Sequence, residues 1–162
     1  MSEIIKVGMA DLKICPCPNK ITTLGLGSCV GIALYDPATK MAGLAHIMLP
    51  DSTQIRNNSN IAKFADTGIA ELIRQMCAAG AGRFRLTAKI AGGAQMFAVR
   101  TATGETSSVG ERNVEAVKAV LMRERIRILA EDTGANYGRT VIFDSETGGY
   151  LIKSVGRPDK II

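Results

Sequence analysis

Short apolar runs separated by turn residues occupy the first third of the chain, a pattern typical of β-strands. Val30–Tyr35 and Met41–Met48 are both apolar, and the turn signal Asp36-Pro37 lies between them. Because a short connection joins the two runs, the pattern predicts a β-hairpin. Ile4–Met9 alternates loosely between apolar and polar residues, which indicates a further strand.

Two later segments have apolar residues at three- and four-residue steps, the spacing of amphipathic helices. The first runs from Ile61 to Met76 and is followed by the stop signals Gly80 and Gly82. The second is expected at about Glu111–Arg123, where basic residues at the C-terminal end suit the helix dipole. The apolar face of this second helix carries Val114, Val117, Val120 and Leu121.

The remaining apolar runs predict strands that follow the helices or separate them. These runs are Leu86–Ile90, Ile126–Ala130, Val141–Phe143 and Tyr150–Val155. The last two flank a turn-rich stretch and therefore predict a second hairpin. Two helices and about six strands indicate an α/β (α+β) fold. The polar segment Asp51–Asn60 is expected to be a mobile loop.

The composition is that of an ordinary globular protein. With 162 residues, 46% of them apolar and 22% charged, the chain is expected to form a single domain over residues 1–162. Met1–Lys13 mixes charged and apolar residues and lacks the uninterrupted apolar stretch of a signal peptide. The apolar runs are too short to span a bilayer. These features predict a cytoplasmic protein without membrane insertion.

Charge and cysteine content argue against two further classes of site. The net charge of +5 is spread along the chain without basic-plus-aromatic runs, so no nucleic-acid partner is expected. The four cysteines are expected to be reduced thiols. Cys15 and Cys17 form a C-x-C step, but the sequence has a single histidine, which supports a four-ligand zinc site poorly. No metal is predicted, and these two cysteines are interpreted as strand-end or turn residues.

The clearest candidate for chemistry is Cys29, which follows the glycine-rich stretch Gly25–Ser28. Small residues let the backbone turn sharply and let a carbonyl substrate approach closely. Free backbone N–H groups beside the thiol can receive the negative charge of a tetrahedral intermediate. A thiol needs a base, and His46 lies on the partner strand of the predicted hairpin. The sequence therefore predicts a Cys29–His46 dyad.

Other interpretations of the same residues remain open at this stage. A buried cysteine is often a small hydrophobe, and a lone histidine between apolar neighbours is often a core residue. Gly25-x-Gly27 lacks the third glycine and the helix of a dinucleotide-binding loop. A nucleophile elbow at Cys29 would need a helix where Val30–Tyr35 predicts a strand. Gly92-Gly93 either forms a tight turn or lines a site.

Six blocks, found in one order along most of the chain, resemble the CheD family of chemoreceptor glutamine deamidases of bacterial and archaeal chemotaxis. The blocks are Thr23–Cys29, Ala45–Ser52, Lys63–Thr67, Ile90–Phe97, Gly110–Asn113 and Ala130–Gly134. Together they cover the chain from about Val7 to Val155. Agreement over six separate blocks makes this resemblance highly specific.

The resemblance implies a Cys-His-Thr triad of Cys29, His46 and Thr23, and no cofactor. It implies packed β-sheets flanked by helices, as in toxin deamidases such as cytotoxic necrotising factor. Members of the family convert glutamine to glutamate on methyl-accepting chemotaxis receptors, some also act as methylesterases, and they bind the phosphatase CheC. The implied reaction is hydrolysis of a linear amide through a cysteine thioester, with Ser28 and Gly27 supplying backbone near the oxyanion.

In this mechanism Thr23 orients His46 by accepting a hydrogen bond. A receptor helix as substrate implies an open groove, for which the polar loop Asp51–Asn60 is the candidate rim. Two alternatives belong to other classes of function. The first is a binding module that regulates CheC and makes little use of its cysteine, and the second is a thiol hydrolase of small amides or esters.

Overall fold

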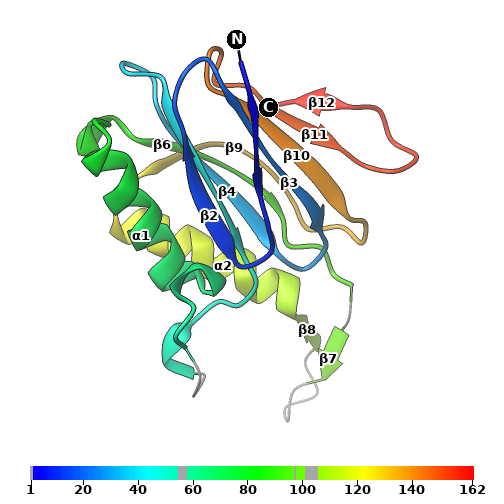
Figure 1. Cartoon of the computed structure of the whole chain (residues 1–162). Coiled ribbons are helices and arrows are strands. Elements are labelled where there is room, and N and C mark those ends of the chain that lie inside the picture. The colour runs from blue at the N-terminus through cyan, green and yellow to red at the C-terminus, as the bar shows by residue number, and fades with distance from the viewer. Residues whose placement is uncertain (1, 55–57, 97, 101–105) are drawn as a thin grey trace.

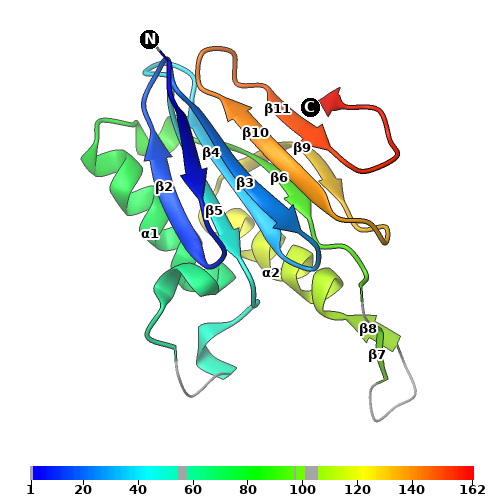
Figure 2. The same ribbon diagram turned by 45° about the vertical axis from the view of Figure 1, so that its right-hand side comes forward.

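Two β-sheets and a pair of helices are stacked in three layers (Figures 1 and 2). The computed structural model of the chain describes residues 2–54, 58–96, 98–100 and 106–162. Within these residues it contains two five-stranded sheets, a two-stranded ribbon and two α-helices. This mixed architecture confirms the predicted fold class of packed sheets flanked by helices.

The strands and helices have the following bounds. The N-terminal strands are β1 (Ile4–Val7), β2 (Asp11–Cys15), β3 (Lys20–Leu26), β4 (Val30–Asp36) and β5 (Met41–Ile47). Next come α1 (Ala65–Ala78), β6 (Thr87–Gly92), β7 (Ala98–Arg100), β8 (Thr106–Ser108) and α2 (Val109–Arg123). The C-terminal strands are β9 (Arg127–Thr133), β10 (Arg139–Asp144), β11 (Tyr150–Lys153) and β12 (Lys160–Ile161). Short 3₁₀ helices cover Ser52–Gln54, Ile61–Lys63 and Arg83–Arg85.

The strand order separates the chain into an outer and a central sheet. The outer sheet has the order β1-β3-β10-β11-β12, and the central sheet has the order β2-β5-β4-β6-β9. The pairs β1–β3 and β6–β9 are parallel, whereas the other pairs within the two sheets are antiparallel. Both helices cover one face of the central sheet, and the outer sheet packs on the opposite face (Figures 1 and 2).

Alternation along β4 and β5 therefore fills two separate cores. The helix-side core contains Val30, Ile32, Leu34, Ile47, Ile69, Leu72, Val117 and Leu121. The inter-sheet core contains Ile21, Leu26, Cys29, Ala33, Leu44, Val141, Phe143 and Tyr150. A strand with both faces covered reads as a continuous apolar run, which is the pattern of Val30–Tyr35.

The predicted hairpin of the first third is confirmed, because β4 pairs with β5 in antiparallel register. The second hairpin is confirmed as β10 and β11. The second helix begins at Val109, close to the predicted Glu111, because the Ser108 side chain caps it by accepting from the Glu111 N–H. In the described residues, no helix is long and apolar enough to cross a membrane.

The first helix begins later than its apolar spacing predicts. Ile61–Lys63 forms a 3₁₀ turn, and Phe64 is extended and bridges to Leu49, so α1 starts only at Ala65. The segment Asp51–Asn60, predicted to be a mobile loop, begins instead with the 3₁₀ turn Ser52–Gln54. Ser52 donates both its N–H and its hydroxyl to Asp66 in the first turn of α1, at 3.1 and 2.6 Å. Residues 55–57 of that loop and Phe97 lie outside the described residues.

Candidate active site

The register of the central sheet places Cys29 and His46 on the same face. Gly31 of β4 lies opposite His46 of β5, and Cys29 comes two positions before Gly31. Because side chains alternate along a strand, Cys29 and His46 both point toward the outer sheet as diagonal neighbours. The Cys29 side chain belongs to the inter-sheet core. The hairpin thus brings together the two residues predicted from the sequence.

Thr23 reaches this position from the other sheet. It lies on β3, directly opposite Val7 of the parallel neighbour β1. Its hydroxyl oxygen is 2.7 Å from Nδ1 of His46 and 2.8 Å from the carbonyl oxygen of Val7. Thr23 and His46 are almost fully buried, at 1% and 0% exposure. The contact therefore bridges the two sheets through the inter-sheet core.

These two contacts decide the tautomer of His46. The Val7 carbonyl can only accept a hydrogen bond, so the single hydroxyl proton of Thr23 is donated to it. The hydroxyl oxygen must then accept from His46, which places the imidazole proton on Nδ1. Nε2 is left with a free lone pair. It is buried and has no hydrogen-bond partner among the residues that the structure describes.

The surroundings keep the base and the nucleophile neutral at rest. Burial lowers the pKa of His46, because the imidazolium is disfavoured away from water. Burial also raises the pKa of the Cys29 thiol, and proximity of its own backbone N–H opposes this effect only partly. At neutral pH the pair is therefore a thiol and a neutral imidazole, not a thiolate and an imidazolium. Cys29 is 8% exposed and His46 is 0% exposed, so Cys29 is the member of the pair that a substrate can reach.

The turn after β6 leaves the backbone N–H of Cys29 available. Gly93 donates its N–H to the Cys29 carbonyl at 2.8 Å, but the reciprocal bond, from the Cys29 N–H to the Gly93 carbonyl, is absent. The reason is that Gly92 and Gly93 have φ values of 108° and 64°, which turn the chain out of the ladder. A Cβ on Gly92 would lie 2.3 Å from the Cys29 carbonyl oxygen. This pair of glycines is therefore part of the site.

Gly27 and Ser28, the residues predicted beside the oxyanion, shape the approach to Cys29. The N–H of Gly27 donates to the Gly25 carbonyl at 3.1 Å, so this N–H is engaged. Ala94 donates to the Gly27 carbonyl at 2.8 Å, and Met96 packs over Gly27, where a Cβ would lie 3.4 Å from its Cγ. The exposed peptide edge next to the thiol is consequently the Ser28–Cys29 unit and not Gly27.

Gly31, two residues after Cys29, allows the outer sheet to pack closely against β4. Tyr150 of β11 donates its hydroxyl to the Gly31 carbonyl at 3.0 Å. A Cβ on Gly31 would lie 2.9 Å from that hydroxyl oxygen and 3.0 Å from Cδ1 of Leu26. Glycine is thus required opposite His46 for the two sheets to approach this closely.

One residue of the site was not identified from its chemistry in the sequence. Asn113 of α2 is fully buried, and its Nδ2 donates to the Ser28 carbonyl at 2.9 Å and to the Met48 carbonyl at 3.0 Å. It occupies a position one turn before Val117 on the buried face of the helix. A polar residue in an otherwise apolar stripe was the signal available in the sequence.

The competing interpretations of the glycine-rich segment do not fit this geometry. Cys29 is followed by β4, so the strand-turn-helix order of a nucleophile elbow is missing. The same strand excludes a dinucleotide loop, in which a helix begins at the glycines. Cys15 is buried at the end of β2 and Cys17 is exposed beyond it. Across residues 2–54, 58–96, 98–100 and 106–162, no three His, Cys, Asp or Glu side chains form a group that could hold a metal ion.

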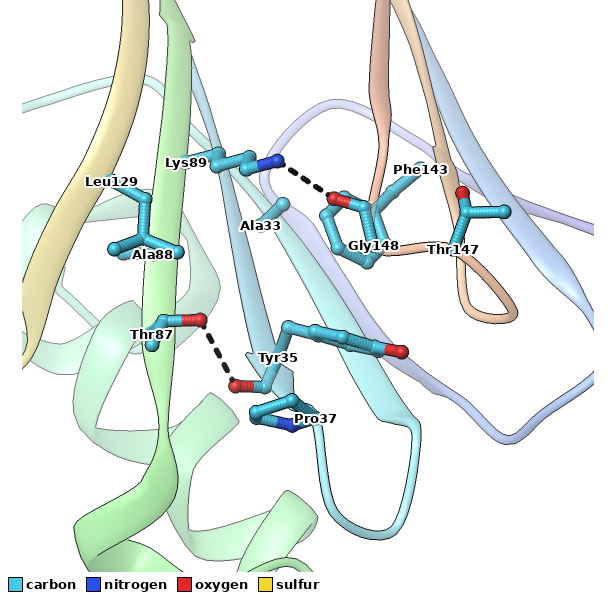
Figure 3. A pocket seen from close by; sticks show the side chains of 10 residues that line it. All are labelled: Ala33, Tyr35, Pro37, Thr87, Ala88, Lys89, Leu129, Phe143, Thr147 and Gly148. Atoms are coloured by element: carbon cyan, nitrogen blue, oxygen red, sulfur yellow. Dashed lines mark hydrogen bonds between the residues drawn. The ribbon is translucent and has the colours of Figure 1, made fainter. Parts of the chain in front are cut away.

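A cavity of about 190 Å³ lies at the other end of β4 (Figure 3). Tyr35, Ala33 and Phe143 are among its lining residues, and Lys89 reaches across it to donate to the Gly148 carbonyl at 2.8 Å. Tyr35 is six residues beyond Cys29, roughly 20 Å along the strand. None of the predicted site residues lines this cavity, so the candidate chemistry lies elsewhere.

Comparisons with known sequences agree on one family. Residues 48–154 match the family model CheD, described as CheD chemotactic sensory transduction. The "Probable chemoreceptor glutamine deamidase CheD" of Lachnoclostridium phytofermentans is 62% identical over 162 residues, covering 100% of both chains. The "Chemoreceptor glutamine deamidase CheD" of Halalkalibacterium halodurans is 48% identical over 163 residues, again covering 100% of both chains.

Solved structures with a similar fold are far more distant in sequence. A Neisseria meningitidis protein of the family DUF152 aligns with a TM-score of 0.53 at 10% identity, over 82% of this chain and 64% of that one. The Bacillus licheniformis hypothetical protein YfiH aligns with a TM-score of 0.52 at 16% identity, over 78% of this chain and 51% of that one. At such identities the likeness concerns the fold alone, and the chain spans less than two thirds of either protein.

Proposed function

Because the chain belongs to the CheD family, we propose that it is a protein-glutamine deamidase that converts glutamine side chains of chemoreceptors to glutamate. The observation that carries this proposal is the hydrogen bond between Thr23 and the Nδ1 atom of His46. It leaves Nε2 without a partner among the described residues, on a side chain that shares a face of the sheet with Cys29. An amidohydrolase needs a nucleophile, a base and an oxyanion donor. Cys29, His46 and the Cys29 N–H fill these three roles in the proposal.

In the first half of the reaction, Nε2 of His46 removes the proton of the Cys29 thiol as the sulfur attacks the glutamine carboxamide. A carbon–sulfur bond forms, and the carbonyl oxygen takes the negative charge. The backbone N–H of Cys29 faces that charge and stabilises it. The intermediate then collapses to a thioester, the carbon–nitrogen bond breaks, and the imidazolium gives its proton to the departing ammonia.

In the second half, Nε2 of the same histidine accepts a proton from water, which adds to the thioester carbon. The carbon–sulfur bond breaks, the sulfur regains its proton from His46, and a glutamate side chain leaves. This sequence uses only a thiol, an imidazole and water, and we expect no cofactor.

Thr23 acts in this scheme by orienting His46. Its hydroxyl holds the ring and fixes the proton on Nδ1, but a neutral oxygen stabilises an imidazolium less than a carboxylate does. Together with the neutral thiol at rest, this predicts a modest turnover.

The proposal extends to the partners that the family resemblance implies. The substrates are methyl-accepting chemotaxis receptors in the cytoplasm, and CheC is a second partner of the same single domain. The small exposed fraction of Cys29 supports a reaction on a side chain that protrudes from a protein surface. The Ser52–Gln54 turn follows the strand of His46, and Asp66 fixes it there as a candidate rim for that surface.

Intact-mass analysis of a receptor cytoplasmic fragment tests the proposed function. Incubation with the wild-type protein is expected to add about one mass unit for each glutamine converted to glutamate. Cys29→Ala is the control and is expected to add none. If neither protein changes the fragment although both bind receptor or CheC, the chain is a regulatory binding module instead. Turnover of free glutamine would favour a hydrolase of small amides.

A further inference from the structure

The side chain of Asn113 links the two strands that carry the proposed nucleophile and base. Ser28 directly precedes Cys29 at the start of β4, and Met48 follows the end of β5, which carries His46. The Nδ2 group of Asn113 donates one hydrogen bond to each of their carbonyls, at 2.9 and 3.0 Å. The amide therefore occupies the end of the β4–β5 ladder, below which α2 crosses the central sheet (Figure 2).

The orientation of this amide follows from its partners. Both partners are carbonyl oxygens, which only accept, so the NH₂ side of Asn113 must face them. Its two protons are then fully used. The Oδ1 atom on the other side is buried and has no partner in the described part of the chain. A buried acceptor without a partner is destabilising, so the arrangement is not the best choice for stability alone.

The bond to Ser28 controls the peptide unit that presents the Cys29 N–H. The Ser28 carbonyl and the Cys29 N–H belong to one planar peptide, which is trans, so they point in opposite directions. When Asn113 holds the carbonyl toward β5, the N–H is held toward β6. On that side the Gly93 carbonyl lies next to Gly110, and the Cys29 N–H has no backbone partner among the residues that the structure describes. A hydrogen bond to the carbonyl also polarises the peptide and strengthens the N–H as a donor.

We propose that Asn113 is a positioning residue that locks the Ser28–Cys29 peptide so that its N–H faces the oxyanion formed on the substrate amide. The inference rests on the proposed deamidase function. Asn113 touches neither substrate nor the reacting atoms, and it acts only through the backbone of Ser28 and Cys29. Its bond to Met48 keeps the strand of His46 in register with that peptide.

The test compares deamidation with alkylation of the same thiol. Amide hydrolysis passes through an oxyanion, whereas displacement of iodide from iodoacetamide by Cys29 does not. Asn113→Leu has a similar volume and removes both donors, and Asn113→Ala is a second version. Val117→Ala is the matched control, because Val117 is buried one turn further along α2 and belongs to the helix-side core.

For the folded Asn113 variants we expect kcat of deamidation to fall at least tenfold, roughly 10- to 100-fold. KM and the alkylation rate are expected to stay within about threefold, since neither depends on the oxyanion. Val117→Ala is expected to lower the melting temperature while keeping kcat. The proposal is overturned if kcat of the folded variants is unchanged, or if alkylation falls in parallel with deamidation.

Two further experiments distinguish a failure of the proposed deamidase function from a failure of the proposed role of Asn113. The wild-type and Cys29→Ala proteins run in the same assay, so an inactive wild type refutes the deamidase function and not the role of Asn113 alone. If both Asn113 variants fail to fold, the wild-type protein is studied by NMR with a glutamate-semialdehyde peptide, whose hemithioacetal oxygen mimics the oxyanion. A downfield shift and slowed exchange of the Cys29 amide proton are expected, and an unshifted amide would refute the proposal.

Discussion

The hydroxyl of Thr23 on the outer sheet lies 2.7 Å from Nδ1 of His46 on the central sheet, so one hydrogen bond between the sheets selects the basic nitrogen. Thr23 can accept from His46 because its own proton is committed to the Val7 carbonyl. The proposed base is therefore oriented by the packing of two sheets and not by its own strand.

Replacing Thr23 tests the orientation of His46 without changing the nucleophile Cys29. Thr23→Val keeps the shape of the side chain but removes the acceptor for the His46 Nδ1–H, and we expect kcat to fall roughly 10- to 100-fold. Thr23→Ser keeps the hydroxyl and is expected to retain most activity. Thr22→Val is the matched control, because Thr22 makes an equally buried hydroxyl bond, to the Val141 carbonyl at 2.7 Å. A loss as complete as that of Cys29→Ala would contradict the orienting role.

The neutral resting pair predicts a particular pH dependence. Deamidation requires neutral His46, whose pKa burial lowers, so kcat/KM should fall with acid only below about pH 6.5. Burial raises the pKa of the Cys29 thiol, so its alkylation by iodoacetamide should be slow at neutral pH and rise steadily into the alkaline range. Stopped-time alkylation measured by mass spectrometry checks this. A fast rate with a plateau near neutral pH would instead indicate a thiolate–imidazolium pair.

Gly31 is predicted to be intolerant of a side chain because of Tyr150. In Gly31→Ala the new Cβ would meet the Tyr150 hydroxyl at 2.9 Å, and we expect the free energy of unfolding to fall by about 1–3 kcal/mol. Tyr150→Phe removes that oxygen, so Gly31→Ala should cost less in this background. A double-mutant cycle by urea unfolding measures the coupling. Strict additivity would show that the hydroxyl is not the obstacle.

The carboxylate of Asp36, far from the proposed site, should affect stability and not catalysis. It is buried and accepts from Nε and Nη2 of Arg85, at 3.0 and 2.9 Å, and from the Gly82 N–H at 2.7 Å. These donors, the Arg85 guanidinium first, lower the pKa of Asp36. A carboxyl whose pKa is lower in the folded than in the unfolded state stabilises the fold above its unfolded pKa of about 3.9, and this contribution is lost in more acidic solution.

Asp36→Asn is accordingly expected to lower the melting temperature at pH 7 by roughly 5 °C or more. The difference from wild type should shrink below about pH 4, where the carboxyl is protonated in the unfolded chain but is still ionised in the folded protein. The kcat of deamidation should be unchanged at temperatures where the variant is folded. Thermal unfolding across a pH series provides the measurement, and a pH-independent difference would argue against the ionised pair.

The local pattern of the sequence was sufficient for the elements that carry Cys29 and His46. Alternation and turn signals predicted the β4–β5 hairpin, and its register brings both side chains to one face. The pattern did not predict β2 or β3. In β3 the two threonines and Gly25 were interpreted as part of the approach to Cys29. Its partner β1 is parallel, and its partner β10 is distant in the sequence. Pairing between strands that are parallel or far apart in the sequence leaves no recognisable pattern in a short stretch of residues.

The roles of Thr23 and Asn113 could not be predicted from the local pattern of the sequence. Thr23 entered the prediction through the family resemblance, because its contact with His46 depends on how two sheets stack. Asn113 stood in a matching block without an assigned role, because its partners are main-chain carbonyls of two other elements. The missing hydrogen bond from the Cys29 N–H to Gly93 likewise depends on the turn at Gly92 and Gly93, which the sequence left as either a turn or a site.

The run of bonds from His46 through Thr23 to Val7 also has a direction. Nδ1–H points to the hydroxyl, and the hydroxyl points to a peptide carbonyl that cannot be protonated at neutral pH. A proton on His46 therefore cannot be passed along these hydrogen bonds to another group. The proton that Nε2 takes from the thiol can leave only from Nε2 itself. It therefore stays beside the substrate until it is transferred to the departing ammonia.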